Sequence, residues 1–199
     1  MTPTAEIPRL RRVPRQARSR ERLQRVLDAA DELLAREGAE ALTTTRVAEA
    51  AGVSVGSLYQ YLPDKGAIVE ALANRYLAEF EAVMDEVVER ASTESWEDPV
   101  GELIDTFADH YRERPGYRAL WFGRHLTEEL RAADHENNIA LAAGVRTVLG
   151  ISEVEARAGV LVADALLQEA FRNDPDGDGV LIGEAKRILR LYLEDVAHG

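Results

Sequence analysis

The stretch from Thr43 to Lys65, TTTRVAEAAGVSVGSLYQYLPDK, constrains the fold of this chain more than any other. It predicts two short helices joined by a tight turn. Thr44 is placed to cap the first, and Gly52 to stop it, because glycine accepts the positive φ common just past a helix end. Ser54 is placed to cap the second helix, which Pro63 ends near Leu62, since the residue before a proline leaves helical geometry.

The second helix is too short to be stable alone in water, so it must be docked on the rest of the chain. Helical spacing directs Val55, Leu58 and Leu62 inward, against Val47 and Ala51. Tyr59 falls at the margin of this apolar stripe. The predicted outward groups are small or form hydrogen bonds: Gly56, Ser57, Gln60 and Tyr61. Such a helix suits the major groove of DNA, where donors and acceptors read base edges.

The run SLYQYLPDKGAIVEAL resembles the signature of the tetracycline repressor (TetR) family, and Thr44 to Val53 resembles the helix and turn before it. Leu62 stands where the family commonly has Phe. The resemblance implies a DNA-binding helix-turn-helix in which Tyr59 and Lys65 contact phosphates and Gln60 reads a base. The residues expected to contact DNA are Arg18, Thr44, Thr45, Arg46, Val55, Gly56, Ser57, Tyr59, Gln60, Tyr61 and Lys65.

The net charge of −12 is unevenly distributed. Residues 1–65 hold 11 basic and 9 acidic side chains, whereas residues 66–199 hold 13 and 27. A basic cluster beside a helix-turn-helix supplies the phosphate attraction, and the acidic remainder discourages adhesion elsewhere. Residues 1–18, with three prolines, predict a mobile arm whose arginines reach DNA; a tail that only improves solubility is the alternative.

The rest of the chain shows helical periodicity and no strand-like alternation, so we expect an all-α fold. We predict an arm over 1–18, a three-helix DNA-binding domain over 19–65, and a helical ligand-binding and dimerisation domain over 66–199. A long helix capped by Asp64 runs to about Ala91. The later helices are predicted at 100–114, 117–132, 134–149, 152–172 and 180–196.

The middle helices carry many aromatic side chains and polar tips, a composition that fits an apolar ligand pocket. Core packing explains them equally well. The family resemblance implies a small-molecule effector among these helices, and Trp121 is expected to report its binding by fluorescence. The candidate ligand residues are Phe80, Met84, Phe107, His110, Tyr111, Trp121, Phe122, His125 and Asn138.

The last two helices carry more apolar surface than one small domain easily covers. Burial against the same pair of a second subunit, as four helices, predicts a homodimer, and the family resemblance implies the same pairing. Two-fold symmetry would present two recognition helices to double-stranded, pseudo-palindromic operator DNA. The expected interface residues are Leu161, Ala165, Gln168, Ala185, Ile188, Leu189 and Tyr192.

Other function classes have weaker support. The loop with Asp174, Asp176, Asp178 and Gly179 resembles a calcium-binding loop, but Ala185 stands where the closing glutamate belongs, so we expect a solvated loop and no metal. We expect neither a cofactor nor catalysis, because no convergent catalytic group is evident. With no Cys, no membrane span and no secretory segment, we expect a soluble cytoplasmic protein. An architectural DNA-binding protein, an all-α enzyme and a helical adaptor remain the alternatives to a ligand-responsive repressor.

Overall fold

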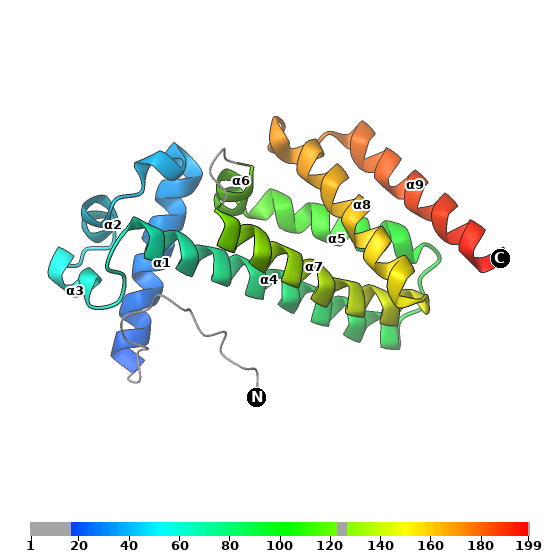
Figure 1. The fold of residues 1–199 in the computed structure, drawn as a ribbon, viewed down its shortest axis with the longest axis horizontal. Coiled ribbons are helices and arrows are strands. Elements are labelled where there is room, and N and C mark those ends of the chain that lie inside the picture. Colours follow the sequence, from blue (N-terminus) through cyan, green and yellow to red (C-terminus); the bar gives the residue numbers. More distant parts are fainter. Residues whose placement is uncertain (1–16, 123–126, 199) are drawn as a thin grey trace. The chain divides into compact units, whose positions relative to one another are not determined.

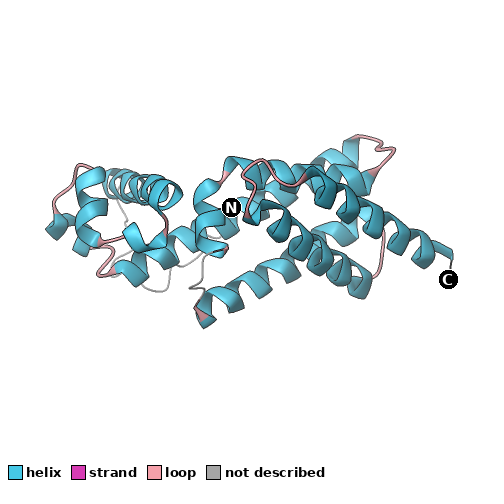
Figure 2. Cartoon of the chain, turned by 90° about the horizontal axis from the view of Figure 1, so that it is seen from above, coloured by secondary structure: helices cyan, strands magenta, loops and turns pink. Residues whose placement is uncertain are grey.

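The structure, a computed structural model, describes residues 17–122 and 127–198 of the chain. Within them lie nine α-helices, one short 3-10 helix and no strand (Figures 1 and 2). This confirms the all-α prediction. The arm before Ala17 and His125 lie outside the described residues, as does the side chain of Arg18.

The chain divides into two compact units. Unit 1 comprises residues 1–78 and 116–130, and unit 2 comprises residues 79–115 and 131–199. The long helix α4 (Lys65–Thr93) contributes its first half to unit 1 and its second half to unit 2. These units reflect packing contacts, so the predicted domain boundaries stay a prediction.

Unit 1 is a small helical body that begins with α1 (Ala17–Glu37) and the 3-10 turn η1 (Ala39–Ala41). The short helices α2 (Thr44–Ala50) and α3 (Val55–Tyr59) follow, and α6 (Pro115–Trp121) joins them. Helix α1 ends before Gly38, which has a φ of 77°. Six apolar residues at helical spacing along α1 are buried, as predicted: Leu23, Val26, Leu27, Ala30, Leu33 and Leu34.

Unit 2 is built from the second half of α4 with α5 (Pro99–Glu113), α7 (Glu128–Leu149), α8 (Glu153–Arg172) and α9 (Gly179–His198). Helices α8 and α9 pack along each other, and α9 also packs on α5 (Figure 1). Ser152 and Glu155 form a capping box that starts α8. The Asp98 carboxylate caps α5 by accepting the N–H of Gly101. It also accepts the Nε–H of Arg190 at 3.0 Å, which links the start of α5 to α9.

The predicted helix break between Ala132 and Asp134 is wrong. Helix α7 runs through both residues without interruption, and α6 ends at Trp121 instead of continuing to Ala132. The sequence from Glu128 to Ala143 contains neither Gly nor Pro, so no local signal opposes a continuous helix there.

None of the helices in the described residues combines the length and the apolar character that a membrane crossing requires.

Candidate functional site

The helix-turn-helix is set by local capping. Thr43, not Thr44 as predicted, caps α2, and its hydroxyl accepts the N–H of Arg46 at 3.2 Å. Gly52 has a φ of 64°, and Ser54 caps α3 by accepting the N–H of Ser57 at 3.1 Å, both as predicted. Helix α2 begins one residue earlier than expected because Thr43, in extended geometry, takes the capping role itself.

A small core holds α3 in place. Leu58 is 1 % exposed, and Leu62 and Val47 are fully buried. The predicted outward orientation of Tyr61 is wrong, since this side chain is only 6 % exposed. Tyr61 lies three residues after the buried Leu58, a spacing that places both side chains near the same side of a helix, and the N–H of Leu62 still donates to the carbonyl of Leu58 at 2.9 Å. Tyr61 therefore belongs to the support of α3 in the free protein.

The outer side of α2 and α3 carries hydrogen-bonding groups. Tyr59 is 42 % exposed, and its hydroxyl lies 3.3 Å from Thr44 Oγ1, which links the two helices on the surface. Thr45, Gly56 and Gln60 are exposed, whereas Val55 and Ser57 are half-buried. These groups leave donors and acceptors on the surface above the small core.

Two cations flank this polar surface. Both carboxylate oxygens of Glu37 accept from Arg46 Nη2, at 2.9 and 2.8 Å, so a phosphate would have to compete with Glu37 for Arg46. The hydrogen bond from Arg46 lowers the pKa of Glu37. Lys65, the first residue of α4, lies 3.8 Å from Glu40, and both side chains are largely exposed. Exposed ion pairs of this kind contribute little to stability, so giving one up for a contact with a phosphate costs little.

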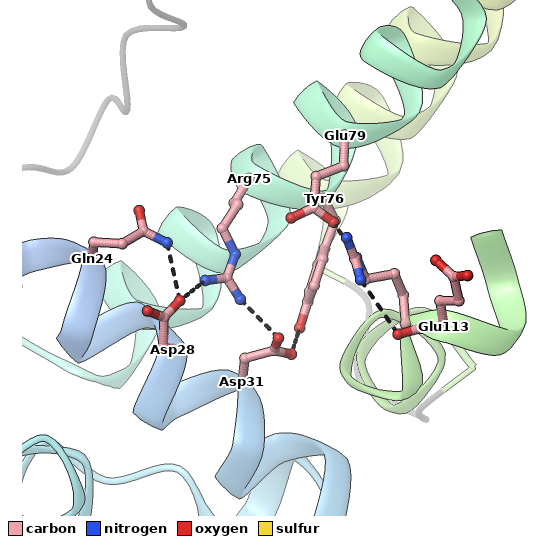
Figure 3. Close-up of polar contacts among 8 residues, drawn as sticks. Gln24, Asp28, Asp31, Arg75, Tyr76, Glu79 and Glu113 are labelled. Carbon is pink, nitrogen blue, oxygen red and sulfur yellow. Dashed lines mark hydrogen bonds and ion pairs between the residues drawn. The ribbon is translucent and has the colours of Figure 1, made fainter. Parts of the chain in front are cut away.

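A polar junction joins α1 and α4 within unit 1 (Figure 3). Arg75 of α4 pairs with Asp28 at 2.8 Å and with Asp31 at 2.9 Å, both on α1. Tyr76 donates its hydroxyl to Asp31. Burial, followed by the hydrogen bond to Asp31, raises the pKa of Tyr76 far above its usual value, so this hydroxyl stays neutral and remains a donor.

Gly116 at the start of α6 completes this junction. A Cβ built on Gly116 would overlap the Asp31 carboxylate and the Tyr76 hydroxyl. The backbone of α6 therefore approaches both groups as only glycine allows. Sequence reasoning missed this contact, because Asp31 lies on the polar side of an amphipathic helix and no local signal distinguishes it from a solvated residue.

Unit 2 brings part of the predicted ligand set into one aromatic cluster. Phe80 stacks on Phe107 with ring centroids 6.0 Å apart, and it meets His110 and Tyr111 edge-on at 4.5 and 5.6 Å. Tyr111 also stacks on Phe171 at 5.5 Å, a residue that was not predicted. Nε2 of His110 is buried and has no hydrogen-bond partner among the described residues, and burial lowers the His110 pKa.

A polar group centred on Asp164 adjoins this cluster. Tyr111 Oη donates to Oδ1 of Asp164 at 3.2 Å, Asn138 Nδ2 to Oδ2 at 3.5 Å, and Gln168 Nε2 to both oxygens at 2.9 Å. Of these residues, Tyr111 and Asn138 were predicted as ligand residues and Gln168 as an interface residue. Asp164 itself was missed, although a single acid within the apolar run GVLVADALL is a visible signal.

The other predicted ligand residues fall elsewhere. Trp121 stacks on Tyr117 at 4.5 Å and Phe122 meets Tyr117 edge-on at 6.4 Å, all within unit 1. Met84 is buried in unit 2, where its side chain fills the space over Gly144 of α7. The eight predicted ligand residues that the structure describes therefore do not form one cluster within either unit.

Helices α8 and α9 expose apolar side chains to solvent. Leu161 and Leu191 are 51 % and 52 % exposed, and Val154, Val162 and Ile188 are exposed as well. We call these five residues, with Ala165 and Tyr192, the apolar face. Of the predicted interface residues, Ala185 is fully buried inside the protomer and Leu189 is only 6 % exposed, because α9 packs on both α8 and α5.

The loop that resembles a calcium site serves the backbone instead. The Asp174 carboxylate accepts the N–H of Asp176, and Asp178 accepts the N–H groups of Val180 and Leu181 at the start of α9. Among the described residues, no group of three or more His, Asp or Glu side chains is arranged to hold a metal ion.

Two family models match the chain. Residues 26–72 match "Bacterial regulatory proteins, tetR family", and residues 94–197 match "Tetracyclin repressor-like, C-terminal domain". The first match contains the whole helix-turn-helix, and the second contains Asp164, the apolar face and the aromatic cluster except Phe80.

Known proteins give the same assignment. A TetR-family transcriptional regulator from Streptomyces coelicolor is 33 % identical, with a TM-score of 0.70 over 89 % of this chain and 98 % of that one. The regulator FadR from Bacillus subtilis, in complex with stearoyl-CoA, shares the fold at 18 % identity, with a TM-score of 0.65 over 85 % and 97 %.

The nucleoid occlusion factor SlmA from Glaesserella parasuis is 32 % identical over 111 residues, 55 % of this chain and 54 % of that protein. The chain thus spans about half the length of the curated relatives it matches. The family consists of DNA-binding regulators and not of enzymes, and its members bind operator DNA and small-molecule effectors. With both family models matched and the helix-turn-helix formed, the chain belongs to the TetR family of bacterial transcriptional regulators.

Proposed function

We propose that this regulator is a homodimeric, cytoplasmic repressor that binds a pseudo-palindromic operator and is released from it by a small-molecule effector. The observation that carries the proposal is the exposed row of Thr45, Gly56, Tyr59 and Gln60 on two short helices held by a buried core. A rigid helix with hydrogen-bonding groups on its outer side is suited to reading base edges in the major groove.

The individual groups have different roles in this proposal. Gln60, the exposed residue at the end of α3, hydrogen-bonds a base edge. The Tyr59 hydroxyl, positioned by Thr44, and the Lys65 ammonium contact phosphates on either side. Arg46 exchanges Glu37 for a phosphate, which costs little because their ion pair is exposed. The Tyr61 ring acts by fixing the end of α3.

The apolar face supports a two-fold dimer. Leu161 and Leu191 each leave about half of their surface in water, which is unfavourable for a protein that stays monomeric. Pairing α8 and α9 with their copies in a second protomer buries these side chains. The same two-fold axis relates two α3 helices, so each protomer reads one half-site.

The effector site belongs to the interior of unit 2 in this proposal. Nε2 of His110 has no hydrogen-bond partner in the described part of the chain, which is unusual in a core that serves packing alone, since buried polar atoms are normally satisfied. Asp164 adds a partly buried acid that three neutral side chains hold in place. Helix α4 carries Phe80 at the aromatic cluster and begins with Lys65 next to the recognition helix. An effector that favours one position of α4 would thereby change operator affinity.

The deciding experiment measures binding of the purified protein to fragments of its own genomic neighbourhood by fluorescence anisotropy, with and without candidate effectors. We expect specific binding to a pseudo-palindrome that an effector weakens. By linkage, operator DNA must lower effector affinity by the same factor, roughly 5- to 150-fold in typical couplings. Equal effector affinity for free and DNA-bound protein contradicts the proposed release.

One observation favours a second candidate function. The similarity to a nucleoid occlusion factor favours a DNA-bound protein whose role does not require an effector. The same titration separates the two candidates, because such a protein binds many genomic sites with an affinity that no small molecule changes.

A further inference from the structure

Asp164 is a partly buried acid whose polar partners are all neutral. It lies on α8 within an apolar run and accepts from Tyr111, Asn138 and Gln168 at 2.9–3.5 Å. Among the described residues, no Lys, Arg or His forms an ion pair with its carboxylate. The carboxylate is thus held in place by three elements of unit 2 without a compensating charge.

This arrangement is costly for an ionised carboxylate. Burial raises the pKa of Asp164 above its ordinary value, and the hydrogen bonds from Gln168, Tyr111 and Asn138 only partly oppose this. A carboxylate removed from water regains its charged form most readily when a cation neutralises it. The site therefore has a physical preference for a positively charged group.

Aromatic rings near Asp164 add to this preference for a positively charged group. Tyr111, which binds Asp164, lies between Phe171 at 5.5 Å and Phe80 at 5.6 Å. The faces of such rings attract cations. Arg112 already lies over the Phe171 ring at 5.6 Å, where it also donates to Asp109 and to the carbonyl of Asp176. His110 does not supply a positive charge for the Asp164 carboxylate, because burial lowers the pKa of the His110 ring and favours its neutral form.

The charge of the surrounding chain acts in the same direction. Residues 66–199 carry 27 acidic and 13 basic side chains, a net charge of −14. A negative potential of this kind concentrates cations near the protein and repels anions.

We infer that the effector of this regulator is an organic cation, with its positive charge against Asp164 and its apolar body against the rings of Phe80, Tyr111 and Phe171. This inference rests on the proposed effector site and adds the chemical class of its ligand. Asp164 anchors the charge, Asn138 and Gln168 hold the carboxylate in place, and the aromatic rings contact the apolar body.

The test uses two ions of the same shape and opposite charge, tetraphenylphosphonium and tetraphenylborate. Calorimetric titration of the full-length wild-type chain, without DNA, is expected to show binding of the cation and at least roughly tenfold weaker binding of the anion. In Asp164→Asn the affinity for the cation should fall roughly tenfold or more. The control Glu169→Gln removes an equal charge from an exposed position of the same helix, so it should leave the affinity unchanged.

Three results would overturn the inference. They are equal binding of the two ions by the wild type, no binding of the cation, or unchanged cation affinity in Asp164→Asn. The first two require no variant, so they hold even if Asp164→Asn folds poorly. Operator binding without ligand, measured in parallel, separates this failure from that of the proposed function: a protein that binds its operator but ignores the cation refutes only the effector class.

Discussion

Replacing Leu161 with Glu is expected to convert the proposed dimer into folded monomers. Leu161 is 51 % exposed on α8, so the substitution leaves the protomer core intact. If the dimer buries this side chain, each protomer loses about 1 kcal/mol of apolar burial, half of the roughly 1.5–3 kcal/mol for a whole leucine. Two copies lose about 2 kcal/mol, and two unpaired carboxylates in the interface cost at least about 2 kcal/mol more.

A total of about 4 kcal/mol weakens the dimer about a thousandfold. Sedimentation velocity at micromolar concentration should then show monomers for Leu161→Glu, and operator affinity should fall because each monomer reaches one half-site. The control is Ile139→Glu, which changes a residue of similar exposure, 43 %, on α7. It should remain a dimer.

Leu189→Glu is expected to act differently from Leu161→Glu. Leu189 is 6 % exposed and packs inside the protomer, so its replacement should lower the melting temperature and unfold the chain instead of releasing folded monomers. A Leu161→Glu protein that stays dimeric with unchanged operator binding would show that the apolar face is not the interface.

Three further predictions concern the helix-turn-helix, the polar junction and Asp164. Lys65→Ala should weaken DNA binding at every sequence and reduce the slope of log affinity against log salt concentration by about one. Gln60→Ala should instead change the sequence preference. An unchanged slope for Lys65→Ala contradicts the proposed contact between Lys65 and a phosphate. Gly116→Ala should lower the free energy of unfolding by about 1 kcal/mol, measured by chemical denaturation. The new Cβ displaces the hydrogen bond from Tyr76 to the charged Asp31, which contributes about 1.5–3 kcal/mol. This loss exceeds the gain in helix propensity of about 1 kcal/mol. A stabilised variant would refute the close approach. Burial raises the Asp164 pKa, so the ionised form costs stability at pH 7 and that cost disappears as pH falls to the ordinary pKa of aspartate. The free energy of unfolding of Asp164→Asn relative to that of the wild type should therefore fall between pH 7 and pH 4, and a relative rise on acidification contradicts the raised pKa.

Local signals were sufficient for the helix-turn-helix. Gly52 takes the expected positive φ, Ser54 caps α3, and α3 ends before Pro63. Capping and proline geometry act over three or four residues, so they can be derived without tertiary structure. The periodic apolar residues of α1 are predictable for the same reason, because one helix face repeats over a few residues.

The orientation predicted at the end of α3 was wrong. Tyr61 was assigned to the outer side, but it follows the buried Leu58 by three residues, a spacing that places it near the same side of a helix, and its ring is 6 % exposed. The break placed between Ala132 and Asp134 was wrong because residues 128–143 hold neither Gly nor Pro, so no local signal ends a helix there.

The sequence by itself determined the all-α fold, the helix-turn-helix and the concentration of negative charge after residue 65, because these depend on short-range geometry and on composition. Only the tertiary structure separated Leu161, which remains exposed, from Leu189, which is buried, although both lie in apolar helical stripes. Only the tertiary structure also brought Tyr111, Asn138 and Gln168 to Asp164. These residues come from three helices, and their contacts exist only when long-range packing fixes which face of each helix turns inward.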